Sequence, residues 1–501
     1  MQADSNTFAH LGTWLADACA RHGDASAIEA AHGQSLSYAQ LLAHAKALAA
    51  QLHERGTLHD EPVHVSVSNQ PLDFAAFLGV WLAGGVVVPV HRSSPQAVSA
   101  RMIAKTQARF VIDTLRGAAA AAWIDDLGTG ASAPRAQLAD AALVIFTSGS
   151  TGAPKGVVVT HRAFAGKLRA IDALLHFGRD ERTLLLLNIT FSFGIWVSLL
   201  TLIGGGTLVL PERFDPAQLL EQLRREQIQR VGVVPTMLRA MLALMPQGAA
   251  SVAALQCPAL RQILTGGEQL SEPLAKQVER LFPAADLVNI FGLTETSTCD
   301  FFQFPAARKA NPLSIGAASG GVQYRVADER GASVPPGVIG ELQIDSPFLM
   351  AGYLDDPELT AAAFSGAWFR TGDLAKLDAD GALYLMGRQK DVIVRGGNKV
   401  TPVEIEKALM LYEDVGTAMA VGAPDAILGE RIHVLIVPGA GREIDLAALK
   451  AFLAQRVEKY KVPDFFYVGE ALPVGRTGKA DRRELRALIE SGALAPLATA
   501  S

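Results

Sequence analysis

Short runs of β-branched and aliphatic residues alternate with longer amphipathic segments through most of this 501-residue chain. The strand-like runs cover residues 63–67, 110–113, 143–147, 207–210 and 230–234. Segments with the character of helices lie between them, for example at residues 37–55, 216–227 and 272–281. Such alternation predicts an α/β fold built on parallel sheets.

The pattern changes near residue 337, where strands follow one another closely and Gly or Asp turns separate them. After Asp391 the chain shows a strand at 392–394, a helix at 403–411, strands at 415–421 and 432–437, and a helix at 445–460. That order predicts a small α+β domain of about a hundred residues. We therefore expect a large N-terminal domain at residues 1–389 and a small C-terminal domain at residues 390–501, joined at a polar hinge near residues 387–391.

Two uncharged stretches raise the question of a membrane span. Residues 183–210 carry no charge and are long enough to cross a bilayer, and residues 74–90 are nearly all apolar. Asn188, Thr190 and three consecutive glycines at 204–206 interrupt the first stretch, and Pro89 interrupts the second. We interpret both as helix-plus-strand units buried in an α/β protein, and we expect no membrane span.

The overall composition argues against several classes of protein. The 45 Lys and Arg residues against 50 Asp and Glu residues give a net charge of −5, which offers no basis for binding nucleic acid or an anionic membrane. The three cysteines are far apart and lack CxxC spacing, which argues against a disulfide scaffold or a zinc ribbon. The N-terminus lacks the features of a secretory signal, so we expect a cytoplasmic location.

The most informative segment spans residues 143–157, where a predicted strand ends at Phe146 and hydroxyl side chains then alternate with glycines. The ligand-binding residues expected here are Thr147, Ser148, Gly149, Ser150, Thr151, Gly152 and Lys155. Glycines let successive backbone N–H groups form an anion-binding nest, the hydroxyls add donors, and the lysine adds positive charge. A polyphosphate suits such a loop. Pro154 before the lysine and Gly156 after it do not fit the loop of P-loop NTPases, and a flexible Ser/Gly linker is the bland alternative.

Residues 147–156, Thr-Ser-Gly-Ser-Thr-Gly-Ala-Pro-Lys-Gly, resemble the signature of the adenylate-forming superfamily. That superfamily comprises acyl-CoA synthetases, adenylation domains of peptide synthetases and firefly-type luciferases. Further segments that resemble it follow in the family's order, and the resemblance covers residues 143–484. It implies a large N-terminal domain of packed sheets and helices that binds ATP and an acid, and a mobile α+β C-terminal domain.

Residues 289–295, Asn-Ile-Phe-Gly-Leu-Thr-Glu, resemble the family's Tyr-Gly-x-Thr-Glu segment. The resemblance implies that Asn289, Phe291 and Gly292 bind the nucleotide, with the phenylalanine stacked on the adenine. It also implies that Thr294 touches the α-phosphate and that Glu295 binds Mg²⁺. An aromatic face suits a purine, and a carboxylate is the oxygen ligand that Mg²⁺ prefers. Phe replaces the family's commoner Tyr, so stacking is kept and a hydroxyl hydrogen bond is lost.

Two further segments resemble motifs around the acid and the ribose. Residues 265–268, Thr-Gly-Gly-Glu, resemble the loop that passes between the acyl pocket and the adenine, which assigns Gly266 to the pocket and Gly267 and Glu268 to the nucleotide. Asp373, in Phe-Arg-Thr-Gly-Asp, resembles the aspartate that grips the ribose hydroxyls, and Arg388 resembles the arginine that contacts the ribose.

The C-terminal part resembles the family in its moving and catalytic residues. The resemblance implies that Lys390 is the hinge and that Gly396 and Gly397 line a pantetheine tunnel in thioester-forming members. Residues 472–482 resemble the motif that carries the catalytic lysine, here Lys479. The implied catalytic residues are Lys479, Thr294, Glu295 and Lys155.

The resemblance implies that ATP activates a carboxylic acid as an acyl-adenylate, which a thiol then attacks. The chain ends about twenty residues after Lys479, so we expect no fused carrier domain, and coenzyme A is the favoured acceptor. A separate carrier protein bearing phosphopantetheine is the alternative, and a luciferase-like oxygenase is a remote one. A non-catalytic nucleotide binder is disfavoured because the charged motif residues are all present.

The acid is the least constrained substrate. Amino-acid activators of the family place an aspartate after a phenylalanine in the region of residues 188–196, whereas Ser192 follows Phe191 here, so an α-amino acid is disfavoured. The residues that could line an apolar pocket are Phe191, Phe193, Trp196, Met237 and Cys299. They favour an aromatic or medium-sized acyl group, although each could equally be a core residue.

Overall fold

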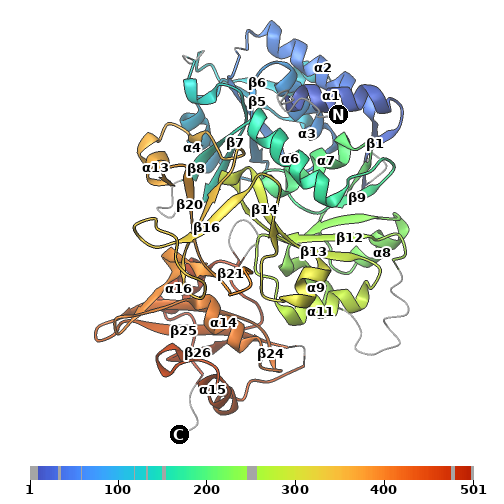
Figure 1. Ribbon diagram of the computed structural model, residues 1–501. Coiled ribbons are helices and arrows are strands. Elements are labelled where there is room, and N and C mark those ends of the chain that lie inside the picture. Colours follow the sequence, from blue (N-terminus) through green and yellow to red (C-terminus); the bar gives the residue numbers. More distant parts are fainter. Residues whose placement is uncertain are drawn as a thin grey trace.

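The computed structural model describes residues 10–31, 35–57, 59–117, 119–130, 134–148, 154–244, 257–439, 441–474 and 480–497. Figure 1 shows a large upper body that contains the N-terminus and a smaller body below it, built from the last part of the chain. The predicted division into a large α/β domain and a small C-terminal α+β domain is confirmed.

Within the described residues, nine strands form the largest sheet, in the order β15-β14-β13-β12-β11-β9-β10-β1-β2. In that order the strands are Ala317–Ala318, Thr298–Gln303, Asp286–Leu293, Gln262–Gly266, Arg230–Val233, Arg182–Leu185, Thr207–Leu210, Ser26–Ala30 and Ser35–Ser37. The inner strands from β13 to β1 are parallel, and the edges at β14 and β2 are antiparallel. The predicted parallel sheet is therefore present.

A second sheet of the described chain has the order β18-β8-β7-β4-β3-β5-β6. Its strands are Gly352–Tyr353, Pro154–Thr160, Ala141–Ser148, Val86–His91, Pro62–Val67, Phe110–Ile112 and Ile124–Asp126. Strands β3, β4, β5 and β7 pair in parallel, while β8 turns back against β7. The predicted strand therefore continues past Phe146 as far as Ser148.

Helices pack between and around these sheets. They are α1 (Leu11–His22), α2 (Tyr38–Glu54), α3 (Pro71–Leu82), α4 (Gln96–Thr106), α5 (Ala120–Trp123), α6 (His161–Leu175), α7 (Ser192–Ile203), α8 (Leu219–Arg225), α9 (Pro235–Ala243), α11 (Glu272–Leu281), α12 (Pro305–Ala310) and α13 (Pro357–Ala362). Helix α3 packs on β3 and β4, α7 packs on β9 and β10, and α1 contacts both helices. Buried hydrogen bonds lock this core: Trp81 Nε1 donates to the carbonyl of Ala142 at 2.8 Å, and Tyr38 Oη donates to that of Gly206 at 2.6 Å.

The two uncharged stretches are the buried units that the sequence predicts. Residues 74–90 contain most of α3 followed by most of β4, and residues 183–210 contain most of β9 together with α7 and β10. Trp81 and Trp196, one in each stretch, are at most 1% exposed. None of the helices in the described residues is long and apolar enough to cross a membrane.

A third sheet joins the large domain to the hinge region. In the described chain its order is β16-β17-β20-β19, with β21 also paired to β20. These strands are Gln323–Ala327, Gly340–Asp345, Trp368–Leu377, Phe364–Ser365 and Leu383–Arg388. The 3-10 turn Gln389–Asp391 follows β21 and leads into the small domain.

The small domain has its own sheet and core. Its described strands, in the order β23-β22-β25-β24 with β26 beside β25, are Asn398–Val400, Ile393–Arg395, Gly429–Pro438, Val415–Asp425 and Phe465–Val468. Its helices are α14 (Pro402–Leu409), α15 (Leu446–Ala454) and α16 (Arg482–Glu490). Contact with the large domain includes a hydrogen bond of 3.1 Å from Lys407 Nζ on α14 to the carbonyl of Leu385 on β21.

Two predicted helices are too long. The helix expected at residues 216–227 is α8 and begins at Leu219, because the Asp215 carboxylate caps a turn at the amide of Ala217. The helix expected at 445–460 is α15 and ends at Ala454. Beyond it Lys461 Nζ pairs with Glu404 and Glu458 at 2.7 and 2.8 Å, which holds a 3-10 turn, and Pro463 follows.

Candidate active site

The segment predicted to bind phosphate closes the hairpin between β7 and β8. Thr147 and Lys155 are directly paired across this hairpin, and Ser148 pairs with Pro154. The predicted residues Gly149, Ser150, Thr151 and Gly152 lie outside the described residues. The hairpin therefore fixes both ends of the loop. It also places Lys155 on β8, between β7 and β18, so residues of these two strands surround the lysine.

Lys155 and Glu295 meet at a tyrosine that the sequence analysis did not identify. The ammonium group of Lys155 lies 5.1 Å from the centre of the Tyr353 ring, and the Tyr353 hydroxyl donates to Glu295 Oε1 at 3.0 Å. Tyr353 is 6% exposed and lies on β18, which pairs with β8 at Val157. Burial raises the pKa of Tyr353 above its usual value, and Glu295 raises it further, so the phenol stays neutral and donates.

Thr294 and Glu295 lie in the 3-10 turn Thr294–Thr296, directly after β13. Asn289 and Phe291 precede them on that strand, and both are partly exposed. Among the described residues the Oδ1 atom of Asn289 is buried without a hydrogen-bond partner. This amide oxygen is therefore available to an N–H donor, such as an amino group on a bound purine.

The Thr-Gly-Gly-Glu segment begins with the last two residues of β12, Thr265 and Gly266, which pair with β13. A Cβ atom at Gly266 would lie 2.5 Å from the carbonyl oxygen of Ile290, so glycine is required for this approach. Gly267 has a φ of +82°, the left-handed region that glycine adopts readily. The Glu268 carboxylate accepts from Thr236 Oγ1 and from Arg239 Nη2, each at 2.8 Å. These partners on α9 were not predicted, because nothing in the sequence links them to residue 268.

Asp373 and Arg388 form an ion pair between β20 and β21. Arg388 Nε donates to Asp373 Oδ1 at 3.0 Å, and the two residues are directly paired in the sheet. Burial raises the pKa of Asp373, and the nearby guanidinium opposes that rise. Within the described part of the chain, Asp373 Oδ2 is buried and accepts no hydrogen bond. A free oxygen on a carboxylate already fixed by arginine fits the predicted acceptor for ribose hydroxyls.

Two functional residues are predicted in the C-terminal part, and only one of them lies among the described residues. Lys390 is exposed, in the turn between β21 and the small domain. Lys479 lies outside the described residues. On either side of its segment Val474 and Ala480 form an isolated β-bridge. Just after it Arg482 pairs with both carboxylate oxygens of Glu406, at 2.7 and 2.8 Å.

The predicted acid-pocket residues are only partly gathered. The rings of Phe193 and Trp196 on α7 are stacked, with centroids 5.5 Å apart and planes 8° apart. Phe191 precedes the helix and is 39% exposed. Cys299 is buried on β14, and burial raises its pKa to about 12. Met237 packs with a different core cluster on α9, so the structure does not join it to the Phe193–Trp196 stack.

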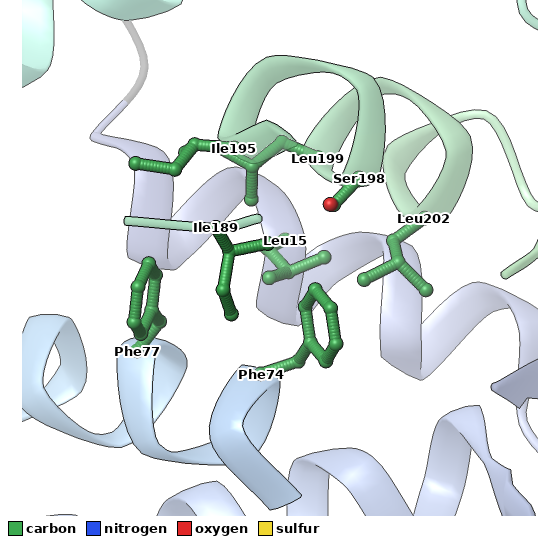
Figure 2. Close-up of a pocket in the computed structure, with 8 residues that line it drawn as sticks. All are labelled: Leu15, Phe74, Phe77, Ile189, Ile195, Ser198, Leu199 and Leu202. Carbon is green, nitrogen blue, oxygen red and sulfur yellow. The ribbon is translucent and has the colours of Figure 1, made fainter. Parts of the chain in front are cut away.

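A small cavity lies between α1, α3 and α7 (Figure 2). Its lining is apolar except for Ser198, whose hydroxyl donates a hydrogen bond to the carbonyl of Gly194 at 2.5 Å. None of the residues predicted to bind ATP or the acid lines it. It is therefore a packing defect of the core and not a part of the candidate site.

The residues around Glu295 offer magnesium a single carboxylate and not a complete set of protein ligands. Among the described residues, no group of three or more His, Cys, Asp or Glu side chains could enclose a metal ion. Mg²⁺ is usually held by one or two carboxylates together with substrate phosphates and water. Glu295, beside Lys155 and the end of the phosphate hairpin, offers one such carboxylate.

Comparison with known proteins identifies the family. The profile of the AMP-binding enzymes matches residues 15–354, and that of the AMP-binding enzyme C-terminal domain matches residues 404–479. The chain belongs to the AMP-binding enzyme family. The resemblance and the prediction that the chain is an enzyme are thereby confirmed.

Individual relatives differ in the chemistry that their names state. A feruloyl-CoA synthase from an Amycolatopsis species is 30% identical over 491 residues, which cover 95% of this chain and 98% of the relative. A component of the linear gramicidin synthase of Brevibacillus parabrevis is 32% identical over 474 residues, 90% of this chain but 6% of that protein. The solved structure of an amide bond synthetase from Marinactinospora thermotolerans superposes with a TM-score of 0.83 at 26% identity, covering 96% of this chain and 99% of that one.

Proposed function

We propose that this protein activates a carboxylic acid with ATP to form an acyl-adenylate and then transfers the acyl group to the thiol of coenzyme A. The observation that carries the proposal is the convergence of Lys155, Tyr353 and Glu295. It joins the end of the phosphate hairpin to the carboxylate predicted to bind metal. Membership of the AMP-binding family and the similarity to a feruloyl-CoA synthase support the same reaction.

The nucleotide would lie across the ends of β7 and β13 and the middle of β20. Phe291 would stack on the adenine, and the free Oδ1 atom of Asn289 would accept from its amino group. Asp373 Oδ2 would accept from the ribose hydroxyls, while Arg388 holds the other oxygen of that carboxylate. The residues proposed to surround the phosphates are Thr147, Ser148, Gly149, Ser150, Thr151, Gly152 and Lys155.

Glu295 is the residue that would hold magnesium, and the ion would neutralise phosphate charge as a Lewis acid. Tyr353 keeps the Glu295 carboxylate oriented through its hydroxyl. Lys155 and Lys479 would add positive charge near the α-phosphate, and Thr294 would add a hydroxyl donor. Stabilisation of developing charge by such preorganised groups is usually the largest single contribution to catalysis.

In the first half-reaction a carboxylate oxygen attacks the α-phosphorus of ATP. A new P–O bond forms, the bond to the bridging oxygen of pyrophosphate breaks, and pyrophosphate leaves with both electrons of that bond. In the second half-reaction a thiolate attacks the carbonyl carbon of the adenylate and AMP leaves, carrying one oxygen of the original carboxylate. We propose that the domain boundary lies at residues 389/390 and that rotation at Lys390 removes Lys479 between the two steps.

The acid is proposed to be aromatic or medium-sized and to lack an α-ammonium group. The flat stack of Phe193 and Trp196 supports an apolar pocket wall at α7. Ser192, rather than an aspartate, is the first residue of that helix, so no carboxylate is available there to pair with an ammonium ion. Phe191 and Gly266 complete the proposed pocket, and Met237 remains a proposed member although it packs with a different core cluster.

A carrier protein is the second candidate acceptor. The 32% identity to a component of linear gramicidin synthase favours it, because that relative is named as part of a peptide-synthesising system. The reaction on the nucleotide would be the same, and only the source of the thiol would differ. For either acceptor we propose a cytoplasmic location, which the free state of Cys19, Cys257 and Cys299 supports.

One experiment tests both the chemistry and the acceptor. Purified protein is incubated with ATP, Mg²⁺ and a panel of carboxylic acids, with and without coenzyme A, and pyrophosphate and AMP are measured. We expect acid-dependent pyrophosphate release, with rapid turnover only when coenzyme A is present. Release that stays at one equivalent with coenzyme A, and turns over only with a phosphopantetheine-bearing carrier, would favour the second candidate. No release with any acid would refute adenylation.

A further inference from the structure

A buried ion pair lies behind the turn that carries Thr294 and Glu295. Lys167 on α6 and Asp300 on β14 are both 0% exposed, and their Nζ and Oδ1 atoms are 2.7 Å apart. The ammonium group also lies 5.1 Å from the centre of the Phe348 ring. Removing two charges from water costs several kcal/mol per ion, so such a pair is weak evidence for stability alone. Its presence calls for another role.

The second oxygen of Asp300 connects this pair to the turn. Thr296 Oγ1 donates to Asp300 Oδ2, and the same hydroxyl accepts from the backbone amide of Leu293 at 3.3 Å. Thr296 is fully buried and ends the turn whose first two residues are Thr294 and Glu295. A chain of three side chains therefore runs from α6 to the base of the candidate magnesium site.

The backbone at this turn is constrained in a way that needs support. Ser297 and Thr298 have φ angles of +61° and +128°, a region that side chains rarely adopt. A Cβ atom at Gly292 would clash with the carbonyl oxygen of Thr298, so the strand and the turn approach very closely. Conformations of this kind are unfavourable and persist only where surrounding contacts hold them.

The turn is also held by the segment that leads to β18. The amide of Met350 donates to the carbonyl of Glu295 at 2.8 Å, and Ser297 Oγ donates to the carbonyl of Phe348 at 2.6 Å. With Tyr353 on its carboxylate, Glu295 is thus fixed from one side by residues 348–353. From the interior, the Thr296 hydroxyl contacts Asp300, and it also lies 3.0 Å from the carbonyl oxygen of Leu293 and 3.3 Å from that of Thr298.

We propose that Lys167, Asp300 and Thr296 are positioning residues that hold the Glu295 carboxylate ready for a divalent cation. The inference rests on the proposed function, since it concerns the metal that would accompany ATP. Lys167 neutralises and orients Asp300, Asp300 anchors Thr296, and Thr296 sets the turn. Outer partners of metal ligands commonly change metal affinity by about 10–100-fold when they are lost.

The test measures the gain in ATP affinity that the metal provides. Isothermal titration calorimetry gives the dissociation constant of ATP with Mg²⁺ and again with a chelator. Thr296→Val removes the link to the turn and leaves the ion pair intact. We expect the metal-dependent gain to fall about tenfold or more, while the affinity for metal-free ATP is unchanged. Thr296→Ser keeps the hydroxyl and should restore the gain.

Two further variants separate positioning from folding. Thr201→Val is the matched control, because Thr201 is also a buried threonine. Its hydroxyl, on α7, donates to the Thr183 hydroxyl on β9 at 3.0 Å, so it is not part of the chain from Lys167 to Thr296. It should leave the gain unchanged. The double variant Lys167→Met/Asp300→Leu removes both charges without leaving one unpaired, so it should fold and still lose the gain.

The outcomes distinguish this inference from the proposed function. A wild-type protein that binds ATP equally with and without metal overturns both. A wild-type protein with a clear metal-dependent gain, which Thr296→Val or the double variant fully retains, overturns the inference alone. Equal losses in Thr296→Val and Thr201→Val, or equal losses with and without metal, also overturn it, because they indicate a merely structural role.

Discussion

Tyr353→Phe isolates the hydrogen bond at the centre of the candidate site. The substitution removes the hydroxyl that donates to Glu295 Oε1 at 3.0 Å and keeps the ring 5.1 Å from the Lys155 ammonium. A hydrogen bond to a charged partner contributes about 1.5–3 kcal/mol. Since 1.36 kcal/mol is a factor of ten, kcat/KM for ATP should fall by about 10–150-fold.

The assay is acid-dependent pyrophosphate release at varied ATP and fixed Mg²⁺. Tyr384→Phe is a matched control, because Tyr384 Oη donates to the Asp378 carboxylate at 2.8 Å in the third sheet, away from Lys155 and Glu295. We expect the control to keep wild-type kcat/KM. A folded Tyr353→Phe protein with wild-type kinetics would refute the assignment of Tyr353 as an orienting residue for Glu295.

Three further predictions concern the motif residues and the core. Lys479→Ala should slow adenylation by about 10²–10³-fold, the scale for losing one transition-state donor, and should spare thioester formation from supplied acyl-adenylate; equal loss of both steps would contradict the two-conformation account. Burial raises the pKa of Asp373, so this carboxylate loses its charge at a higher pH than an ordinary aspartate does. As the pH is lowered, ATP binding that needs the charged form should therefore weaken already at that higher pH. ATP titrations at a series of pH values should show this loss of affinity in the wild type and not in Asp373→Asn. Leu199→Ala enlarges the apolar cavity of Figure 2 and should lower the free energy of unfolding by about 2–5 kcal/mol in urea denaturation, with unchanged KM for ATP.

Much of the fold follows from local sequence patterns. Residues 272–281 form the expected helix because their apolar side chains repeat at helical spacing, and residues 74–90 and 183–210 are helix-plus-strand units interrupted at their glycines. The helix predicted to end at Tyr460 stops at Ala454, and in the segment beyond it Lys461 pairs with Glu404, a residue 57 positions away. Local periodicity carries no information on a contact of that kind.

The candidate site, too, was predicted only in part from the sequence. The resemblance to the family's motifs identified Lys155, Glu295, Asp373 and Arg388, and the structure pairs the last two directly. Tyr353 was missed, because its role depends on the pairing of the short strand Gly352–Tyr353 with β8. Lys167 and Asp300 were missed for a similar reason: they are 133 positions apart in the sequence, and only the packing of α6 against β14 brings them together.

The most direct test of the chemistry follows the oxygen atoms of the acid. The protein is supplied with ATP, Mg²⁺, coenzyme A and a carboxylic acid labelled in both carboxylate oxygens with the heavy isotope, and the products are analysed by mass spectrometry. Attack of the carboxylate on the α-phosphorus predicts AMP that carries one heavy oxygen and pyrophosphate that carries none. Unlabelled AMP, or ADP with labelled phosphate, would contradict acyl-adenylate formation.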